Sequence, residues 1–226
     1  MSVQLLHADC MVYMAGLPDK AFDLAIVDPP YGIGVGNTPM SSKWASSRLE
    51  KKDWDSAVPD QAYFDELRRV STNQIIFGGN YFILPPSRCF VVWDKGAGFK
   101  GRSFAECEFA WSSFDENAKV YSRDPLACGD YKGKFHPTQK PVALYEWLIT
   151  NYAKPGQRIL DTHLGSGSSA IAAHNLGFDF VGTELDADYY AAACKRFEAH
   201  KAQQTLFQPD DYSRVERDAF QGALSL

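Results

Sequence analysis

The strongest constraint on the fold of this 226-residue chain is an apolar run that stops at two consecutive prolines. Leu24 to Val27 has the composition of a buried strand, and Asp28 follows it directly. Pro29 and Pro30 have no backbone N–H to donate, so a ladder of sheet hydrogen bonds cannot continue through them. The chain must therefore pass from a buried strand into a stiff turn that carries a carboxylate and the ring of Tyr31.

This turn has the chemistry of a site for a planar ring that bears an amino group. Asp28 and the Pro29 carbonyl accept hydrogen bonds, and Tyr31 offers a flat aromatic face. A nucleobase can give its amino hydrogens to the first two groups and lie against the third. The same four residues are equally compatible with a purely structural turn, so the interpretation depends on the rest of the chain.

Strand-like and helix-like segments alternate along the sequence, which favours a mostly parallel sheet with helices on both faces. The length fits a single α/β domain. A Gly-rich loop between two of the later strands would allow those strands to pair antiparallel. Strands are expected at 3–8, 22–27, 73–77, 89–93, 106–111, 158–161 and 178–183, and helices at 59–70, 141–152, 168–176 and 186–201.

Composition limits the compartment and the ligands. No apolar stretch approaches the ~20 residues of a membrane span, and the N-terminus lacks the features of a secretory signal. The five cysteines show no Cys-x-x-Cys spacing and the five histidines no ligand spacing, so we expect free thiols, no metal and a cytoplasmic location. The net charge of −5 argues against a strong, indiscriminate binder of polyanions.

A second motif lies between a predicted strand and a predicted helix. The pattern Gly165-x-Gly167-x-x-Ala170 permits a tight turn, a close approach of the backbone to a ligand and helix–strand packing. Glu184 ends the next strand, where a carboxylate can accept hydrogen bonds from both ribose hydroxyls. These features predict a cofactor that contains adenosine, and they suit a nicotinamide dinucleotide equally well.

The segment from Phe135 to Pro141 decides between these cofactors. Alone it is a loop bounded by prolines, with Thr138 available as a helix cap. Together, however, Asp-Pro-Pro-Tyr, His-Pro-Thr-Gln-Lys-Pro and Leu-Gly-Ser-Gly-Ser-Ser closely resemble the motifs of amino-group DNA methyltransferases that use S-adenosylmethionine. The resemblance extends from about Val3 to Arg196, and the motif order resembles that of the permuted beta class, which includes cell-cycle-regulated and phage-borne adenine enzymes.

The resemblance implies a circularly permuted, Rossmann-like α/β fold with a seven-stranded, mostly parallel sheet that has one antiparallel strand. It implies one methyltransferase domain over 1–226, with DNA-recognition insertions near 34–55 and 95–134 and a C-terminal tail at 203–226. A homodimer is expected by analogy with beta-class relatives. The short motif Gln203–Phe207 resembles peptides that dock on the sliding clamp, although packing of its apolar residues on the core is an alternative.

The resemblance also assigns residues to the two halves of an active site. Asp28, Pro29, Pro30 and Tyr31 would form the catalytic pocket. The cofactor would be held by Asp9, Cys10, Asp28, His136, Thr138, Gln139, Lys140, Asp161, His163, Gly165, Ser166, Gly167, Ser168, Glu184 and Leu185. One departure stands out, because Thr162-His163 occupies the place where the family usually has Pro-Phe.

Double-stranded DNA is the substrate that the resemblance implies, with the target base flipped out of the helix. Candidate phosphate or base contacts are Lys43, Arg48, Lys51, Lys100, Arg102 and Lys132. Asp28 favours N6 of adenine, because enzymes that act on N4 of cytosine usually carry Ser at this position. Methylation of cytosine N4 is the first alternative, and a non-catalytic DNA-binding protein on the same fold is the second.

Overall fold

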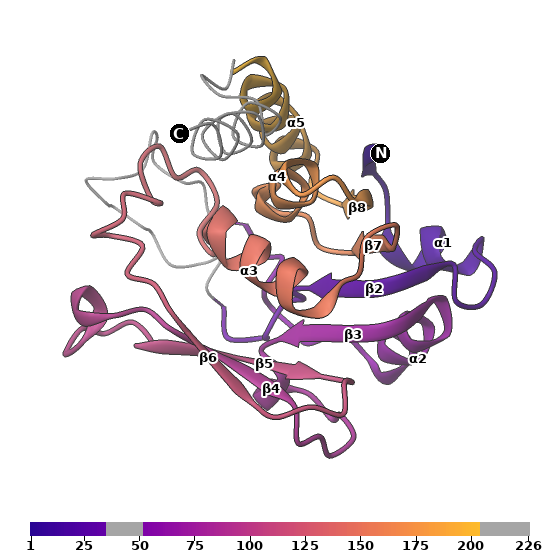
Figure 1. Ribbon diagram of the computed structural model, residues 1–226, viewed down its shortest axis with the longest axis horizontal. Helices are drawn as coiled ribbons and strands as arrows, with labels where there is room; N and C mark the ends of the chain where they lie inside the picture. Colours follow the sequence, from indigo (N-terminus) through magenta and orange to yellow (C-terminus); the bar gives the residue numbers. More distant parts are fainter. Residues whose placement is uncertain (35–51, 204–226) are drawn as a thin grey trace, which may run out of the picture.

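The computed structural model describes residues 1–34 and 52–203, and its central feature is an eight-stranded mixed sheet (Figure 1). The strands are β1 (Val3–His7), β2 (Phe22–Val27), β3 (Ser71–Phe77), β4 (Phe90–Asp94), β5 (Cys107–Ser112), β6 (Lys119–Ser122), β7 (Arg158–Asp161) and β8 (Asp179–Glu184). Their order in the sheet is β1-β8-β7-β2-β3-β5-β4-β6. Only β5 is antiparallel to its neighbours in this sheet, which confirms the Rossmann-like class and the single antiparallel strand.

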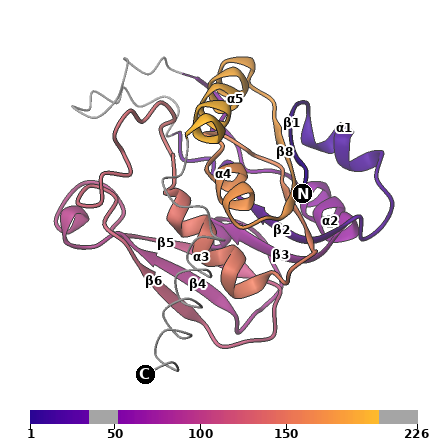
Figure 2. The same cartoon turned by 45° about the horizontal axis from the view of Figure 1, so that its top comes forward.

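Helices cover both faces of the sheet. Helices α1 (Cys10–Ala15) and α2 (Gln61–Val70) pack beside each other on one face. Helices α3 (Val142–Tyr152), α4 (Ser168–Asn175) and α5 (Ala187–Ala202) are grouped on the other, as Figure 2 shows. Short 3-10 turns lie at Gly79–Tyr81 and Ala97–Phe99. Among the described helices, none is both long and apolar enough to cross a membrane.

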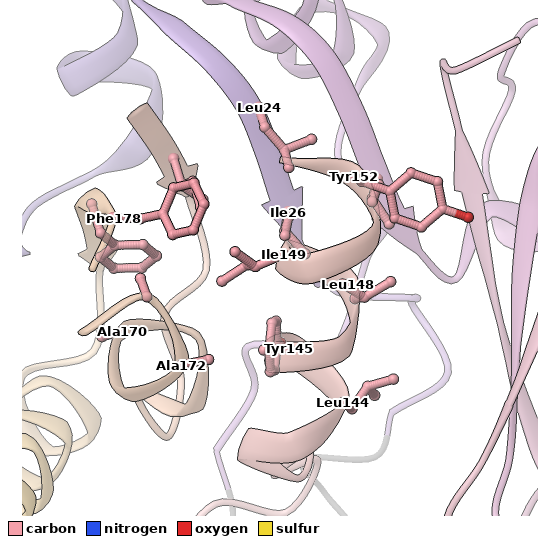
Figure 3. Close-up of a cluster of buried hydrophobic side chains, with 14 of the residues drawn as sticks. Leu24, Ile26, Leu144, Tyr145, Leu148, Ile149, Tyr152, Ala170, Ala172 and Phe178 are labelled. Atoms are coloured by element: carbon pink, nitrogen blue, oxygen red, sulfur yellow. The ribbon is translucent and has the colours of Figure 1, made fainter. Parts of the chain in front are cut away.

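The alternation of strand side chains divides the core into two layers. Leu24 and Ile26 of β2 belong to the cluster under α3 and α4, together with Leu148 and Ile149 (Figure 3). Ala25 and Val27, which point to the opposite face, belong to the cluster under α2. Burial of each large aliphatic side chain stabilises the fold by roughly 1.5–3 kcal/mol, so β2 is held rigidly on both faces up to the residue before Asp28.

Two elements differ from the sequence-based expectations. The prediction of seven strands was one too few, because β6 is a four-residue strand at the sheet edge whose Val120 is 65% exposed and leaves no apolar signal. Helix α1 was also missed, although Asp9 is a suitable N-cap and accepts hydrogen bonds from the N–H groups of Met11 and Val12. Lys43, Arg48, Lys51 and nearly all of the Gln203–Phe207 motif lie outside the described residues.

The polar residues singled out in the sequence meet where the parallel strands have their carboxyl ends. Asp28 follows β2, Asp161 ends β7 and Glu184 ends β8, and these are carboxyl ends of parallel strands. From the neighbouring strands β2 and β7 the chain continues in opposite directions across the sheet, to β3 and to β8. Open α/β sheets bind their ligands at such a switch point.

Candidate active site

Two adjoining cavities open at this edge of the sheet. The glycine-loop cavity, of about 420 Å³, is lined by residues such as Asp9, Gly165 and Glu184. The aromatic cavity, of about 560 Å³, is lined by residues such as Tyr31 and Tyr131. The two cavities share four lining residues: Asp28, Pro30, Trp54 and Thr138.

The glycine loop gives the first cavity a wall of backbone and carboxylate. Gly165 and Gly167 have φ values of +52° and +73°, which favour glycine, and a Cβ on Gly165 would lie 3.4 Å from the His136 ring. Glu184 accepts hydrogen bonds from the N–H groups of Gly165 (2.8 Å) and Asp186 (3.0 Å). Burial raises the pKa of Glu184. Each of its two oxygens keeps a further lone pair for a ligand.

All but three of the predicted cofactor residues line this cavity. The exceptions are Asp161, Gly167 and Ser168. Asp161 accepts hydrogen bonds from the His163 N–H (3.0 Å) and the Ser169 hydroxyl (2.6 Å), and burial raises the pKa of its carboxyl to about 7. The Ser168 hydroxyl donates to the Lys140 carbonyl (2.7 Å), which fastens the loop to the segment before α3.

The unusual Thr162-His163 pair is hydrogen-bonded by a tyrosine from α2. The Tyr63 hydroxyl lies 2.6 Å from the Thr162 hydroxyl, which lies 2.9 Å from Nδ1 of His163. Burial lowers the pKa of His163 to about 4, so that its ring is neutral at pH 7. The two polar side chains of Thr162 and His163 therefore have hydrogen-bond partners within the cavity wall. Tyr63 was not predicted, since 99 residues separate it from Thr162.

Asp28 lies where the two cavities meet, and both its carboxylate oxygens have partners. Oδ1 accepts a hydrogen bond from the Tyr31 hydroxyl at 2.5 Å, and Oδ2 forms an ion pair with Lys140 Nζ at 2.5 Å. Lys140, only 3% exposed, also lies 3.0 Å from Glu108 Oε2. Glu108 Oε1 is in turn 2.7 Å from Lys95 Nζ. Charges thus alternate along a buried network of Asp28, Lys140, Glu108 and Lys95.

The pKa values in this network follow from burial and from the neighbouring charges. Burial raises the pKa of Asp28, and Lys140 opposes that rise. Burial acts in the same direction on Glu108, but Lys140 and Lys95 outweigh it and lower the pKa of Glu108 to about 2. Burial favours the neutral amine of Lys140, yet Asp28 and Glu108 prevail and raise its pKa. Lys140 is therefore the cation that favours the ionised form of both carboxylates.

The turn after β2 is fixed by Asp55, which accepts hydrogen bonds from the N–H groups of Tyr31 (2.7 Å) and Gly32 (2.9 Å). The Tyr31 ring stacks on Tyr81, with the centroids 4.9 Å apart and the planes at 12°. A Cβ on Gly78 would lie 2.2 Å from the Tyr31 ring, so only glycine fits there. Tyr81 thus covers one face of the ring that the sequence suggested for stacking.

The structure adds residues that the sequence did not single out. Glu108 and Lys95 join the network around Asp28, and Lys134 lines the aromatic cavity. The one sequence signal for Glu108 is an acid inside the otherwise uncharged strand Cys107–Ser112. The predicted DNA contacts Lys100, Arg102 and Lys132 are exposed, and of these only Arg102 lines the cavity. The described residues contain no cluster of His, Cys, Asp or Glu that could hold a metal ion.

Comparison with known proteins bears directly on this site. Residues 88–195, which include the glycine loop and Glu184, match the DNA methylase family N6_N4_Mtase. The chain is 25% identical over 240 residues to the type II methyltransferase M2.DpnII of Streptococcus pneumoniae, covering 86% of this chain and 89% of that protein.

Two solved structures show the same fold. The complex of M1.HpyAVI with SAM has a TM-score of 0.56 and 22% identity, covering 86% of this chain and 100% of that chain. The cytosine-N4-specific PvuII DNA methyltransferase has a TM-score of 0.57 and 12% identity, covering 95% of this chain and 93% of that chain. Over residues 88–195 the chain is thus similar to the DNA methylase family, and it shares the fold of these two solved structures.

Proposed function

We propose that the protein transfers a methyl group from S-adenosylmethionine to N6 of an adenine flipped out of double-stranded DNA. The observation that carries this proposal is the position of Asp28 between two cavities, one suited to the donor and the other to a base. The motif order Asp-Pro-Pro-Tyr, then His-Pro-Thr-Gln-Lys-Pro, then the glycine loop supports membership in the permuted beta class.

The glycine-loop cavity has the groups that S-adenosylmethionine needs. Glu184 offers carboxylate lone pairs for the two ribose hydroxyls. The side-chain oxygen of Gln139 is buried and has no hydrogen-bond partner among the residues described, so it can accept from the ammonium of the methionine portion. When bound, S-adenosylmethionine supplies an electrophilic methyl group on a sulfonium.

The chain's own contribution is to orient the acceptor amine. The lone pair of an exocyclic amine is delocalised into its ring, which makes the amine a poor nucleophile. Asp28 and the Pro29 carbonyl can accept hydrogen bonds from its two N–H groups. These bonds direct the lone pair at the methyl group and stabilise the positive charge that develops on nitrogen. The carboxylate has about four lone-pair sites, so it can serve the amine while it keeps Tyr31 and Lys140. Lys140 favours its ionised form.

The identity of the methylated base is the direct test. Purified protein with tritiated S-adenosylmethionine and genomic DNA is expected to yield label in N6-methyladenine after hydrolysis to nucleosides. The Asp of the catalytic motif supports adenine, whereas the similarity in fold to a cytosine-N4-specific enzyme keeps cytosine as the second candidate. Label found only in N4-methylcytosine would replace the proposed acceptor, and no label in DNA would reject the function.

Replacement of Glu184 by glutamine is expected to weaken S-adenosylmethionine binding by about 10–100-fold. Loss of one hydrogen bond to a charged group is worth about 1.5–3 kcal/mol, and the amide presents a donor where the carboxylate presents an acceptor. Isothermal titration with S-adenosylmethionine measures the change. Glu198→Gln, a similar substitution on the surface of α5, serves as the control and should bind the donor normally. Equal affinity of the two variants would contradict the assigned role of Glu184.

A homodimer and a contact with the sliding clamp stay predictions from the sequence. The Gln203–Phe207 motif ends beyond the part of the chain that the structure describes.

A further inference from the structure

Lys134 is a buried cation that lines the aromatic cavity without a carboxylate partner. Lys134 is 7% exposed, and its Nζ lies 4.2 Å from the centroid of the Tyr131 ring. Within residues 1–34 and 52–203, no carboxylate oxygen lies within ion-pair distance of this amine. An isolated buried ammonium is strongly unfavourable unless a partner compensates it.

The neighbouring carboxylates are already used by other lysines. Glu108 is shared between Lys95 and Lys140, and Asp28 is paired with Lys140. Three lysines therefore face two carboxylates, and the unbalanced positive charge falls on Lys134. Burial, reinforced by Lys95 against the attraction of Glu108, lowers the pKa of Lys134 to about 8. The amine is still mostly protonated at pH 7, at an energetic cost that an incoming anion would relieve.

The backbone around Lys134 is fixed before any ligand arrives. Arg123 forms a bidentate ion pair with Asp130 (2.7 and 2.9 Å), and the Lys134 N–H donates to the Tyr131 carbonyl at 3.2 Å. These contacts hold in place the segment that connects β6 to α3 (Figure 1). A lysine held in this way offers a positioned charge, in contrast to Lys132, which is exposed two residues earlier.

We propose that Lys134 binds the backbone phosphate of the flipped nucleotide while its base occupies the aromatic cavity. This inference rests on the proposed function. The base must place its amine at Asp28, so its phosphate has to find a cation elsewhere along the cavity. Lys95 is neutralised by Glu108, and Arg102 is exposed at the cavity edge. Lys134 is thus the buried cation in the described lining that keeps an uncompensated charge.

The test pairs a protein substitution with a neutral phosphate in the DNA. Duplexes that contain the mapped target adenine carry a methylphosphonate on its 5′ or 3′ side, and binding is measured with S-adenosylhomocysteine present. For the unsubstituted protein, one of the two methylphosphonates is expected to weaken binding about tenfold. Lys134→Met should weaken binding of the ordinary duplex by a similar factor, lose sensitivity to that methylphosphonate, and reduce the salt-dependence slope by about one.

Two variants make the outcome specific. Lys132→Met should keep the full response to the methylphosphonate, and Lys134→Arg should restore it because the charge returns. Normal binding of S-adenosylhomocysteine by Lys134→Met shows that the variant is folded. If Lys134→Met keeps the methylphosphonate response while the unsubstituted protein methylates adenine, the phosphate site is wrong and the proposed function stands. If the unsubstituted protein methylates no DNA, the proposed function itself fails.

Discussion

Asp28→Ala is expected to lower the rate of methyl transfer by about 10³-fold and to leave S-adenosylmethionine binding within a few-fold of normal. Groups that stabilise charge developing in a transition state contribute on the order of 10²–10³-fold each. In the proposed mechanism Asp28 also accepts a hydrogen bond that orients the amine, so we place the loss at the upper end of this range. The donor should still bind, because Glu184 and the glycine loop are unchanged.

The fold should survive this substitution. Without Asp28, Lys140 Nζ still has Glu108 at 3.0 Å, so the buried amine is not left without a partner. Single-turnover transfer to DNA and titration with S-adenosylhomocysteine separate the chemical step from binding. Asp23→Ala on the same strand is the control, since Asp23 accepts a hydrogen bond from the Arg158 N–H at the opposite end of β2. Transfer by Asp28→Ala within tenfold of normal would remove Asp28 from the catalytic role.

The parts of this site that could be predicted are those encoded by short stretches of sequence. Two consecutive prolines end β2 whatever the fold of the rest of the chain, because they have no N–H to donate. The spacing of Gly165 and Gly167 likewise predicts a tight turn in the loop that contains them. The meeting of these two segments also followed, because carboxyl ends of parallel strands lie at one edge of a sheet. The strand end and the glycine loop depend on neighbouring residues alone, and their meeting depends only on the parallel direction of the strands.

The remaining contacts depend on pairings between distant segments. Glu108 reaches Lys140 because β5 is antiparallel and presents its first residues at the same edge where the parallel strands end. Tyr63 reaches Thr162 because α2 covers the opposite face of the sheet from α3. Neither pairing has a short-range signal. The sequence therefore predicted Lys140 only as part of a cofactor segment, whereas the structure places its charge between Asp28 and Glu108.

Lys140 connects the two cavities physically. Its carbonyl accepts the hydrogen bond from Ser168 at the start of α4, and its ammonium contacts Asp28. Lys140 thus contacts both the glycine loop, through its carbonyl, and the carboxylate of Asp28, through its ammonium. Because its buried ammonium pairs with Asp28 and Glu108, replacement of the Lys140 side chain should affect stability as well as the proposed catalysis.

Lys140→Met is expected to lower the free energy of unfolding by about 3–5 kcal/mol, the range for removal of one partner from a buried ion pair. Met fills most of the lysine volume, so the lost free energy of unfolding reflects the missing charge more than any loss of packing. Asp28 then lies buried without a cation, while Glu108 keeps Lys95 at 2.7 Å. Urea unfolding measures the change. Lys201→Met, which removes a surface ion pair with Glu198, should have little effect.

The pH dependence of this loss identifies Asp28 as its source. Burial without Lys140 raises the folded-state pKa of Asp28 above its unfolded value, so protonation favours the fold. The stability deficit of Lys140→Met should therefore be largest at pH 8 and shrink as the pH falls toward 5. Adding Asp28→Asn removes the ionisable group, and the double variant should regain stability at pH 8 and lose this pH dependence. A deficit that stays constant from pH 8 to pH 5 would instead mean that packing, and not the charge of Asp28, depends on Lys140.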